Sequence, residues 1–274
     1  MRIREGSKLF ALSAPPKASD GFARLVPYVE WYLALVPNSG SYTVDDLYKP
    51  KDYDNLHPSS ECLMCMRRLY FEKNPKYADQ MVEKIDTELQ VTFKIGHALH
   101  GMIQHWFENM TDIEGLPDLV ENEAKVTDEA LRVAGSIDSI LKFPDVEEPV
   151  PIEIKTKTAD LFKSLSAPDA AHRLQLGMYL MLTGLPYGIL LYISKDRPHS
   201  FKEFVVEQMD MGPTLRRWQQ VKDALDAGSP SLLPYECECD TSKFKNCPCR
   251  GFCRREGVIR GGGIPIWQPP TTMR

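Results

Sequence analysis

Two carboxylates and a lysine, Asp138, Glu153 and Lys155, have the residue types and the spacing of a metal site. They lie in two short segments, GSID and IEIKT. Side chains along a strand alternate between the two faces of a sheet. Glu153 and Lys155 are therefore expected on one face, while the isoleucines beside Glu153 point the other way into a core. A carboxylate and an ammonium group would then meet at one place.

The two segments are predicted to form an antiparallel hairpin. Between them, residues 143–149 read FPDVEEP, a turn-prone stretch. Its centre lies midway between positions 138 and 153, so Asp138 is expected roughly opposite Glu153. Cross-strand neighbours have Cβ atoms about 4.5–5.5 Å apart, which is close enough for two carboxylates to hold one hard cation.

This combination of groups suits the hydrolysis of a phosphodiester. That reaction needs an activated water, in-line attack and stabilisation of the developing negative charge. Asp138 and Glu153 are expected to hold Mg²⁺ or Mn²⁺, and Lys155 to position the water and stabilise the transition state. The backbone carbonyl of Ile154 is a candidate for a further oxygen ligand. His100 is a candidate nitrogen ligand that would favour Mn²⁺.

Helices are predicted on both sides of these strands. A helix over about 94–108 follows from apolar residues at three- and four-residue spacings, namely Ile95, Leu99, Met102, Ile103 and Trp106. Gly96 and His100 lie one turn apart at its edge, which predicts a partly buried imidazole beside a close backbone approach. In a second helix, about 170–183, Gln175 and Tyr179 share a face and can jointly reach Lys155, a phosphate or a base. The pattern Glu-x-Lys alone is common on solvated strands. It indicates a functional site here because Asp138 and the two predicted helices accompany it.

Periodicity and turn residues predict the remaining elements. Strands are expected at 119–126, 131–141, 150–158, 187–194 and 201–208. Helices are expected near 23–36, from Ser59 through Cys65 and Tyr70, and from Gly212 to near Gly228. The core order is helix, three strands, helix, strand.

Composition favours a soluble intracellular protein. The 274 residues are 43% hydrophobic, enough for one large domain or two small ones, and no segment reads as a membrane span or signal peptide. A cytoplasmic location follows, in a bacterial cell or in the host cytoplasm if a phage encodes the protein. The net charge of −5 argues against a uniformly basic, non-specific nucleic-acid binder, although the tail after Thr241 is locally basic. Seven cysteines, an odd number in a reducing compartment, favour metal or cluster ligation over disulfides.

The series Gly96/His100, GSID, EIKT and Gln175/Tyr179 resembles the RecB-like branch of the PD-(D/E)xK nuclease superfamily, over roughly residues 94–195. The resemblance implies an α/β core in αβββαβ order, with a central mixed sheet flanked by helices. It implies metal binding by His100, Asp138 and Glu153, catalysis by Lys155, and support from Gln175 and Tyr179. Glu121 or Glu123 would match an auxiliary acidic position.

The cysteines resemble those of the iron–sulfur members of that family, which have one cysteine before the core and three after it. Cys65, followed by Met-Arg-Arg-Leu-Tyr, is similar to the first, and Cys247 and Cys253 have the expected separation in the tail. Phe244 stands where the third tail cysteine would be, so Cys249 or Cys239 would complete a [4Fe–4S] cluster that joins the two ends of the core. Zinc is the alternative cofactor, held by Cys62-x-x-Cys65 and two tail cysteines.

The resemblance implies a Mg²⁺- or Mn²⁺-dependent DNA exonuclease, with single-stranded ends as the expected substrate. Family members serve recombination, repair, phage DNA processing and CRISPR spacer acquisition. The chain has no helicase motif, so unwinding would need a helicase or recombination protein as partner; no membrane partner is expected. There are two alternatives to an exonuclease. One is a DNA-binding module without turnover, and the other is an interaction protein stabilised by zinc. The expected parts are an N-terminal extension (1–58), a helical segment with the first cluster cysteine (59–93), the nuclease core (94–210), and a C-terminal helix with a cysteine-rich basic tail (211–274).

Overall fold

The computed structural model describes residues 21–35, 52–78, 80, 87–111, 113–234 and 247–255. Cys237, Cys239 and most of the basic tail, on which part of the sequence interpretation depends, lie outside the described residues. Within them, no helix is both long and apolar enough to cross a lipid bilayer.

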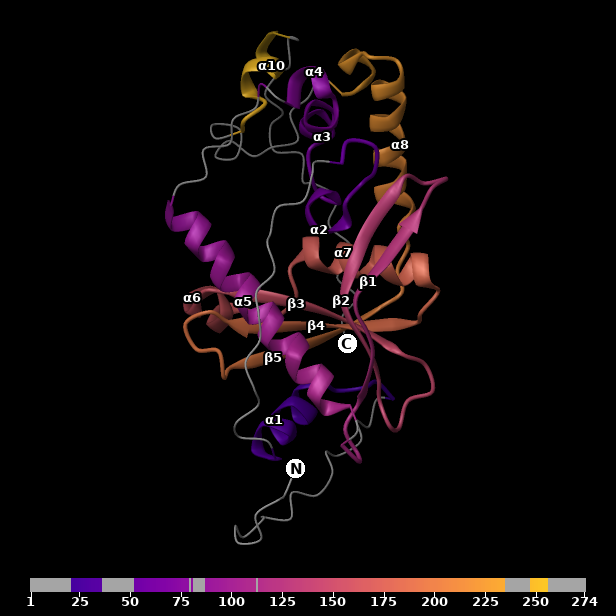
Figure 1. Cartoon of the computed structure of the whole chain (residues 1–274). Coiled ribbons are helices and arrows are strands. Elements are labelled where there is room, and N and C mark those ends of the chain that lie inside the picture. The colour runs from indigo at the N-terminus through magenta and orange to yellow at the C-terminus, as the bar shows by residue number, and fades with distance from the viewer. Residues whose placement is uncertain are drawn as a thin grey trace, which may run out of the picture.

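A five-stranded mixed sheet forms the centre of the protein (Figure 1). Its strands, in spatial as well as sequence order, are β1 (Asp118–Asp128), β2 (Val133–Lys142), β3 (Val150–Lys157), β4 (Tyr187–Ser194) and β5 (Phe201–Glu207). Only β3 and β4 run parallel, and the other neighbours are antiparallel. The parallel pair needs a crossover connection, which two helices supply. They are α6 (Ala159–Ser164) and α7 (Ala170–Thr183).

The predicted αβββαβ core is confirmed, with α6 as an addition. Its first helix is α5 (Thr87–Met110), longer than predicted at its N-terminal end. The helix α7 ends where expected, because Gly184 takes the left-handed conformation at φ 73° that closes a helix C-terminus. The β2–β3 hairpin also has the predicted register. Ser139 pairs with Ile152 and Leu141 with Val150, so that the same register sets Asp138 against Glu153.

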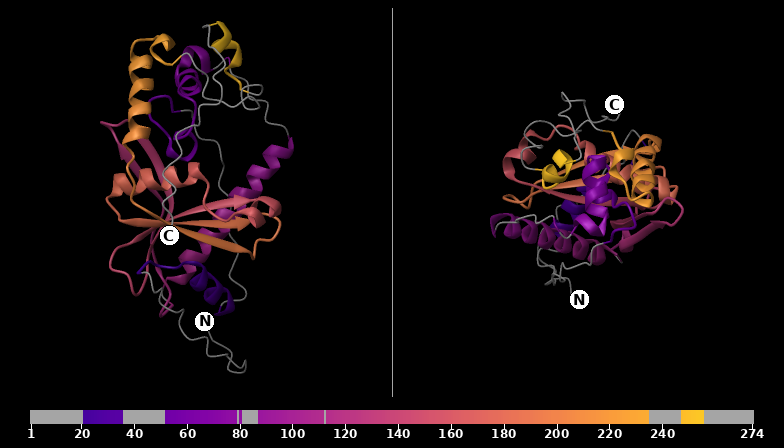
Figure 2. Two further views of the ribbon diagram at one scale, coloured as in Figure 1. Left: turned by 180° about the vertical axis from the view of Figure 1, so that it is seen from behind. Right: turned by 90° about the horizontal axis from the view of Figure 1, so that it is seen from above.

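Two helical layers bury the faces of the sheet (Figures 1 and 2). On one face, α5 and α1 (Val26–Leu35) cover a core that includes Ile103, Phe107, Ile152 and Ile154, all fully buried. On the other face, α7 packs Leu176 against Leu190. The alternation along β3 therefore places its isoleucines in the core under α5, as predicted, and turns Glu153 towards α7.

The apolar stripe predicted along α5 is only partly confirmed. Leu99 and Ile103 are buried, but Ile95 is 44% exposed, and so are Val91 and Phe93 at 51% and 50%. The periodicity was right about the helix and wrong about the burial of Ile95. The N-terminal end of α5 extends past the sheet (Figure 1), so Ile95 is less covered there than Leu99 and Ile103 are further along the helix.

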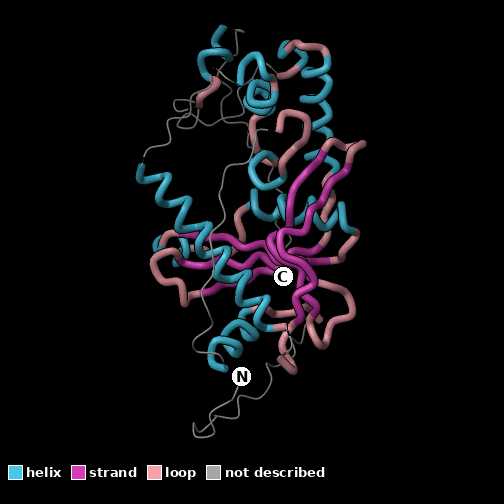
Figure 3. The backbone as a smooth tube through the Cα atoms, in the orientation of Figure 1, coloured by secondary structure: helices cyan, strands magenta, loops and turns pink. Residues whose placement is uncertain are grey.

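A second group of helices stands above the sheet. It contains α2 (Pro58–Glu61), α3 (Met66–Lys73), α4 (Pro75–Ala78), α8 (Gly212–Asp226), η1 (Pro230–Leu232) and α10 (Arg250–Arg255). These pack around one apolar cluster, which we call the cysteine lobe because it includes Cys62, Cys249 and Cys253. The β1–β2 hairpin reaches up to it as an arm (Figure 3). Trp218 of α8 donates a hydrogen bond to the carbonyl of Leu131 at the arm's tip, 2.8 Å away.

The single helix predicted from Ser59 through Tyr70 is wrong. The chain forms α2 and α3 with a break between them, and Cys65 is the extended residue before α3, at ψ 131°. No Gly or Pro marks this break. Arg217 of α8 donates to the carbonyl of Met64 at 3.1 Å, so the carbonyl is satisfied by a tertiary contact instead of a helical one.

Candidate active site

The site lies where β2 separates from β3. The two strands pair only through Ser139–Leu141 and Val150–Ile152, and Asp138 is the first residue of β2 beyond this ladder. Its side chain takes over the role of a strand neighbour, because Asp138 Oδ2 accepts a hydrogen bond from the backbone N–H of Ile154 at 2.6 Å. A carboxylate thereby sits in the fork between the strands, held by the backbone of the residue that follows Glu153.

Glu153 and Lys155 meet on the α7 face of β3, as their spacing predicted. Lys155 Nζ lies 2.8 Å from Glu153 Oε1 and donates to Gln175 Oε1 at 2.7 Å. Gln175 Nε2 donates back to Glu153 Oε1 at 2.5 Å and lies 3.4 Å from the hydroxyl of Tyr179. The helix pair Gln175 and Tyr179 thus fixes the strand pair, and Gln175 holds both the carboxylate and the ammonium group.

Packing locks Tyr179 in place. The ring is 1% exposed, and it lies against Gly135 of β2, where a Cβ atom would come within 2.8 Å of the phenol oxygen. Any larger side chain at position 135 would push the ring away. The glycine of the GSID segment therefore lets α7 approach the fork between the strands closely.

The helix α5 supplies the other wall of the site. His100 Nδ1 lies 3.6 Å from Asp138 Oδ2, and the His100 side chain is 26% exposed. Gly96, one turn earlier, is buried against β3, and a Cβ atom there would be 3.2 Å from Thr156 Oγ1. The predicted partly buried imidazole beside a close backbone approach is therefore present.

Sequence reasoning missed Gln104, one further turn along α5. Its amide nitrogen donates to the backbone carbonyl of Asp138 at 2.8 Å and to Glu123 Oε1 at 3.0 Å. Glu123 also accepts from Ser136, and it stands in β1 with a positive φ of 51°. Of the two acidic residues considered on this strand, Glu123 is the one joined to Asp138 through Gln104. No local pattern marks these contacts, because they join residues far apart in the sequence.

Burial and neighbouring charges set the protonation of the two carboxylates. Burial raises the pKa of Glu153, and the nearby Asp138 charge raises it further, to about 8 against the pull of Lys155. Burial acts in the same direction on Asp138, but His100 and Lys155 outweigh it and hold the pKa of Asp138 below its usual range. Burial lowers the pKa of His100, and the Asp138 carboxylate overcomes this and raises it. The site therefore holds one carboxylate that ionises readily and one that resists ionisation.

The donor set fits a hard divalent cation. Glu153 Oε2 is buried and accepts no hydrogen bond from any described residue. A cation would give this oxygen a partner and would relieve the repulsion between the two carboxylates. In the part of the chain that the structure describes, no three His, Cys, Asp or Glu side chains are arranged to bind a metal ion together. The oxygen donors that this geometry brings together are the carboxylates of Asp138 and Glu153, with His100 beside Asp138.

A second polar cluster, formed around His172 and Tyr192, adjoins the site and was not predicted from the sequence. His172, one turn before Gln175 on α7, has Nδ1 2.7 Å from the hydroxyl of Tyr192. That hydroxyl accepts from the backbone N–H of Asp169 at 3.1 Å, and the Asp169 carboxylate pairs with Lys157, which follows Lys155 on the same face of β3. Burial lowers the pKa of His172 to about 3, and the Lys155 charge adds to this effect.

His172 should therefore make the stability depend on pH. Its folded-state pKa lies below the unfolded value of about 6.5, so the unfolded chain binds the proton first and stability falls as pH drops below about 6.5. At about pH 5.5 the loss should be about 1.4 kcal/mol. Urea unfolding at about pH 7.5 and at about pH 5.5 measures the drop in the free energy of unfolding. This drop should be about 1.4 kcal/mol smaller in His172→Asn than in wild type. The exposed His199 provides the control substitution His199→Asn. Equal pH dependence in wild type and His172→Asn would refute the prediction.

Described cysteines from both ends of the core meet in the cysteine lobe. Phe252 of α10 packs its ring 5.2 Å from that of Phe71 on α3, which brings Cys253 beside the N-terminal helices. Cys249 and Cys253 are buried, while Cys65 and Cys247 are half-buried. A hydrogen bond with the Cys247 thiol, followed by burial, raises the pKa of Cys249.

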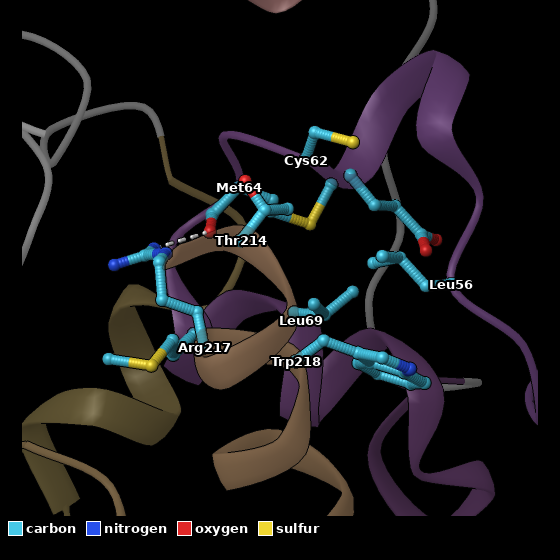
Figure 4. A pocket seen from close by; sticks show the side chains of 9 residues that line it. Leu56, Cys62, Met64, Leu69, Thr214, Arg217 and Trp218 are labelled. Carbon is cyan, nitrogen blue, oxygen red and sulfur yellow. Dashed lines mark hydrogen bonds between the residues drawn. The ribbon is translucent and has the colours of Figure 1, made fainter. Parts of the chain in front are cut away.

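A small cavity lies between α2, α3 and α8, next to these cysteines (Figure 4). Its lining includes Leu69 and Trp218, together with Cys62 and Met64. Burial raises the pKa of Cys62 to about 12, so this thiol stays neutral in the cavity wall. The cavity is a packing gap of the lobe and is separate from the fork that holds Asp138.

Asp138, Glu153 and Lys155 lie together where β2 and β3 separate, with both carboxylates buried. The match to a protein family agrees with this arrangement. Residues 80–254 match the PD-(D/E)XK nuclease superfamily, and the chain belongs to that family. The family resemblance inferred from the sequence is thereby confirmed.

The chain is also similar to individual proteins. The chain is 29% identical over 180 residues to the CRISPR-associated exonuclease Cas4 of Saccharolobus solfataricus. The matched region covers 65% of this chain and 81% of that protein. Its fold is similar to the crystal structure of SSO0001, with 21% identity, a TM-score of 0.46 and coverage of 77% and 90% of the two chains. It is also similar to an alkaline exonuclease from Laribacter hongkongensis, with 13% identity, a TM-score of 0.45 and coverage of 64% and 90%.

Proposed function

We propose that the protein is a Mg²⁺- or Mn²⁺-dependent DNA exonuclease that acts on single-stranded ends. The observation that carries the proposal is the arrangement of Asp138, Glu153 and Lys155 at the strand fork, with Gln175 holding Glu153 and Lys155 together. Membership of the nuclease superfamily supports the reaction type, and the relatives named as exonucleases support action at DNA ends.

Each residue of the site has a role in this proposal. Asp138 and Glu153, with the carbonyl of Ile154, hold the cation, and His100 either joins them or orients Asp138. The cation, when bound, supplies an activated water and neutralises charge on the phosphate. Lys155 positions the attacking water and stabilises the negative charge that develops on the phosphoryl oxygens. Gln175 keeps the Lys155 ammonium group within reach of that position, and Tyr179 holds Gln175.

Cleavage of end-labelled DNA tests the proposal. Wild-type protein, purified without oxygen, should shorten single-stranded DNA in the presence of Mn²⁺ or Mg²⁺, and chelation should stop it. Lys155→Ala should lower the rate by about a hundredfold to a thousandfold, because a preorganised charge at the transition state is lost. Lys163→Ala, on the surface of α6, is the matched control and should retain activity. Undiminished cleavage by Lys155→Ala would refute the role assigned to that lysine, and the absence of any cleavage by wild type would refute the function.

We also propose that the cysteine lobe holds a [4Fe–4S] cluster. Cys65, Cys247 and Cys253 would be ligands, with Cys249 or Cys239 as the fourth. Cys247, Cys249 and Cys253 share one apolar cluster with residues of α3, the helix that begins directly after Cys65, and this supports the proposal. Thiolates are the usual ligands of such clusters. The cluster would be structural, joining α3 to the tail at a distance from the strand fork.

Metal analysis separates the cluster from its zinc alternative. Anaerobically purified protein should contain iron and acid-labile sulfide and absorb broadly near about 400 nm. Cys253→Ser should lose both, while Cys62→Ser should retain them. Stoichiometric zinc in place of iron would favour a Cys-ligated zinc site and would overturn the cluster.

A further inference from the structure

The exposed half of α5 carries a stripe of side chains that leads to the active site. Phe93, His97, His100 and Gln104 follow one another at spacings of four, three and four residues, so they lie on one face of the helix. The lower two reach the site directly, His100 at Asp138 Oδ2 and Gln104 at the Asp138 carbonyl. With a rise of 1.5 Å per residue, Phe93 stands about 10 Å further along the helix axis than His100.

The upper part of this stripe is aromatic and open to solvent. Phe93 is 50% exposed, and His97 is also exposed. The His97 ring lies 6.4 Å from that of His100 at an angle of 45°, so the aromatic surface is continuous with the site. A half-exposed phenylalanine costs free energy in water, and here it lies on the same helix face as His100.

The charges around the stripe suit an anionic chain. From Val91 to Ile103 the only formally charged side chain is Lys94, which is exposed. Lys195 reaches the same part of the helix and donates to the carbonyl of Thr92 at 3.0 Å. Phosphates are therefore attracted beside an apolar aromatic face, the combination that single-strand-binding sites use.

We propose that Phe93 and His97 form a stacking platform for unpaired bases of the DNA strand whose phosphate lies at Asp138. The platform would hold the bases next to the cleaved bond and would favour a single strand, because paired bases present no free face. This inference rests on the proposed function and adds the part of the protein that recognises the substrate.

Binding measured without cleavage tests the platform. All variants are made in the Lys155→Ala background, and the affinity for a short fluorescent single strand is measured in the presence of Ca²⁺. The same measurement is made with an abasic strand of equal length, which keeps the phosphates and removes the bases. Phe93→Ala should weaken binding to the normal strand about tenfold, the effect of losing one stacked base, and should leave binding to the abasic strand unchanged. Phe93→Tyr should bind as tightly as the Lys155→Ala parent.

Ile95→Ala is the matched control. Ile95 is similarly exposed on the same helix turn but lies on another face, so its loss should change affinity less than twofold. An unchanged affinity of Phe93→Ala, an equal loss on the abasic strand, or an equal loss in Ile95→Ala would each overturn the platform. If the protein with Lys155 intact cleaves DNA but Phe93→Ala leaves the affinity for the single strand unchanged, the stacking platform is refuted and the proposed function is not. If wild type neither binds nor cleaves DNA, the proposed function fails with it.

Discussion

Asp138→Asn is expected to lower the rate of DNA cleavage about a thousandfold without unfolding the protein. The substitution keeps the shape of the side chain and an oxygen that can accept the hydrogen bond from the Ile154 N–H. It removes the one carboxylate whose pKa the site holds low, and with it the charge that best attracts a divalent cation. Loss of metal charge at the transition state costs several kcal/mol, and about 4 kcal/mol corresponds to a thousandfold in rate.

The stability of this variant should change much less than its cleavage rate. Asp138 and Glu153 are both buried, and the Asp138 charge raises the pKa of Glu153. Without metal, the variant loses the attraction of His100 and Lys155 that lowers the pKa of Asp138, and it gains relief of the repulsion that raises the pKa of Glu153. These two effects oppose each other, so the free energy of unfolding should change only slightly. Cleavage rates, calorimetric titration with Mn²⁺ and urea unfolding together measure this. Asp145→Asn, in the exposed turn of the same hairpin, should change none of the three. Full activity in Asp138→Asn would contradict the assignment, and a large loss of stability would make the residue structural.

Local patterns predicted the elements that carry the site, because each has a cause within a few residues. The β2–β3 register follows from a turn-rich segment between two alternating strands, and the end of α7 follows from Gly184. The placement of Glu153 and Lys155 on one face follows from strand geometry alone. A pattern of period two or of period 3.6 contains this information directly.

Contacts between distant residues could not be predicted in this way. Glu203 of β5 accepts hydrogen bonds from the first backbone N–H groups of α1, 2.5 Å from that of Leu25, although 178 residues separate the two. Gln104 donates to the backbone carbonyl of Asp138, which is 34 residues further along the chain in another element. Ile95 fits the helical period but is 44% exposed, and periodicity does not say which part of a helix its neighbours cover. At the break before Cys65, Arg217 of α8 donates to the carbonyl of Met64, a contact that no sequence signal near the break reveals.

Lys73→Met is expected to destabilise the protein by about 3–5 kcal/mol, the cost of removing one partner of a buried ion pair. Lys73 Nζ lies 2.9 Å from Glu61 Oε1, and the two side chains are 3% and 9% exposed. The ammonium group also donates to the carbonyls of Asp52 and Asn55, at 3.0 and 2.6 Å. Burial raises the pKa of Glu61 and Lys73 opposes that shift, so without Lys73 the carboxylate is left buried with no counter-charge.

The pair joins α3 to α2 in the cysteine lobe, so its loss should loosen the segment that carries Cys65. Urea unfolding measures the change, and Lys76→Met, an exposed lysine on α4, should cost less than about 0.5 kcal/mol. Adding Glu61→Gln to Lys73→Met should recover part of the loss, because the neutral amide needs no counter-charge and its oxygen can still accept from the N–H of His57. The destabilisation should also shrink as pH falls, since protonation then neutralises Glu61. A loss no larger than that of Lys76→Met would mean that water reaches Glu61, and that the lobe is held by its apolar cluster alone.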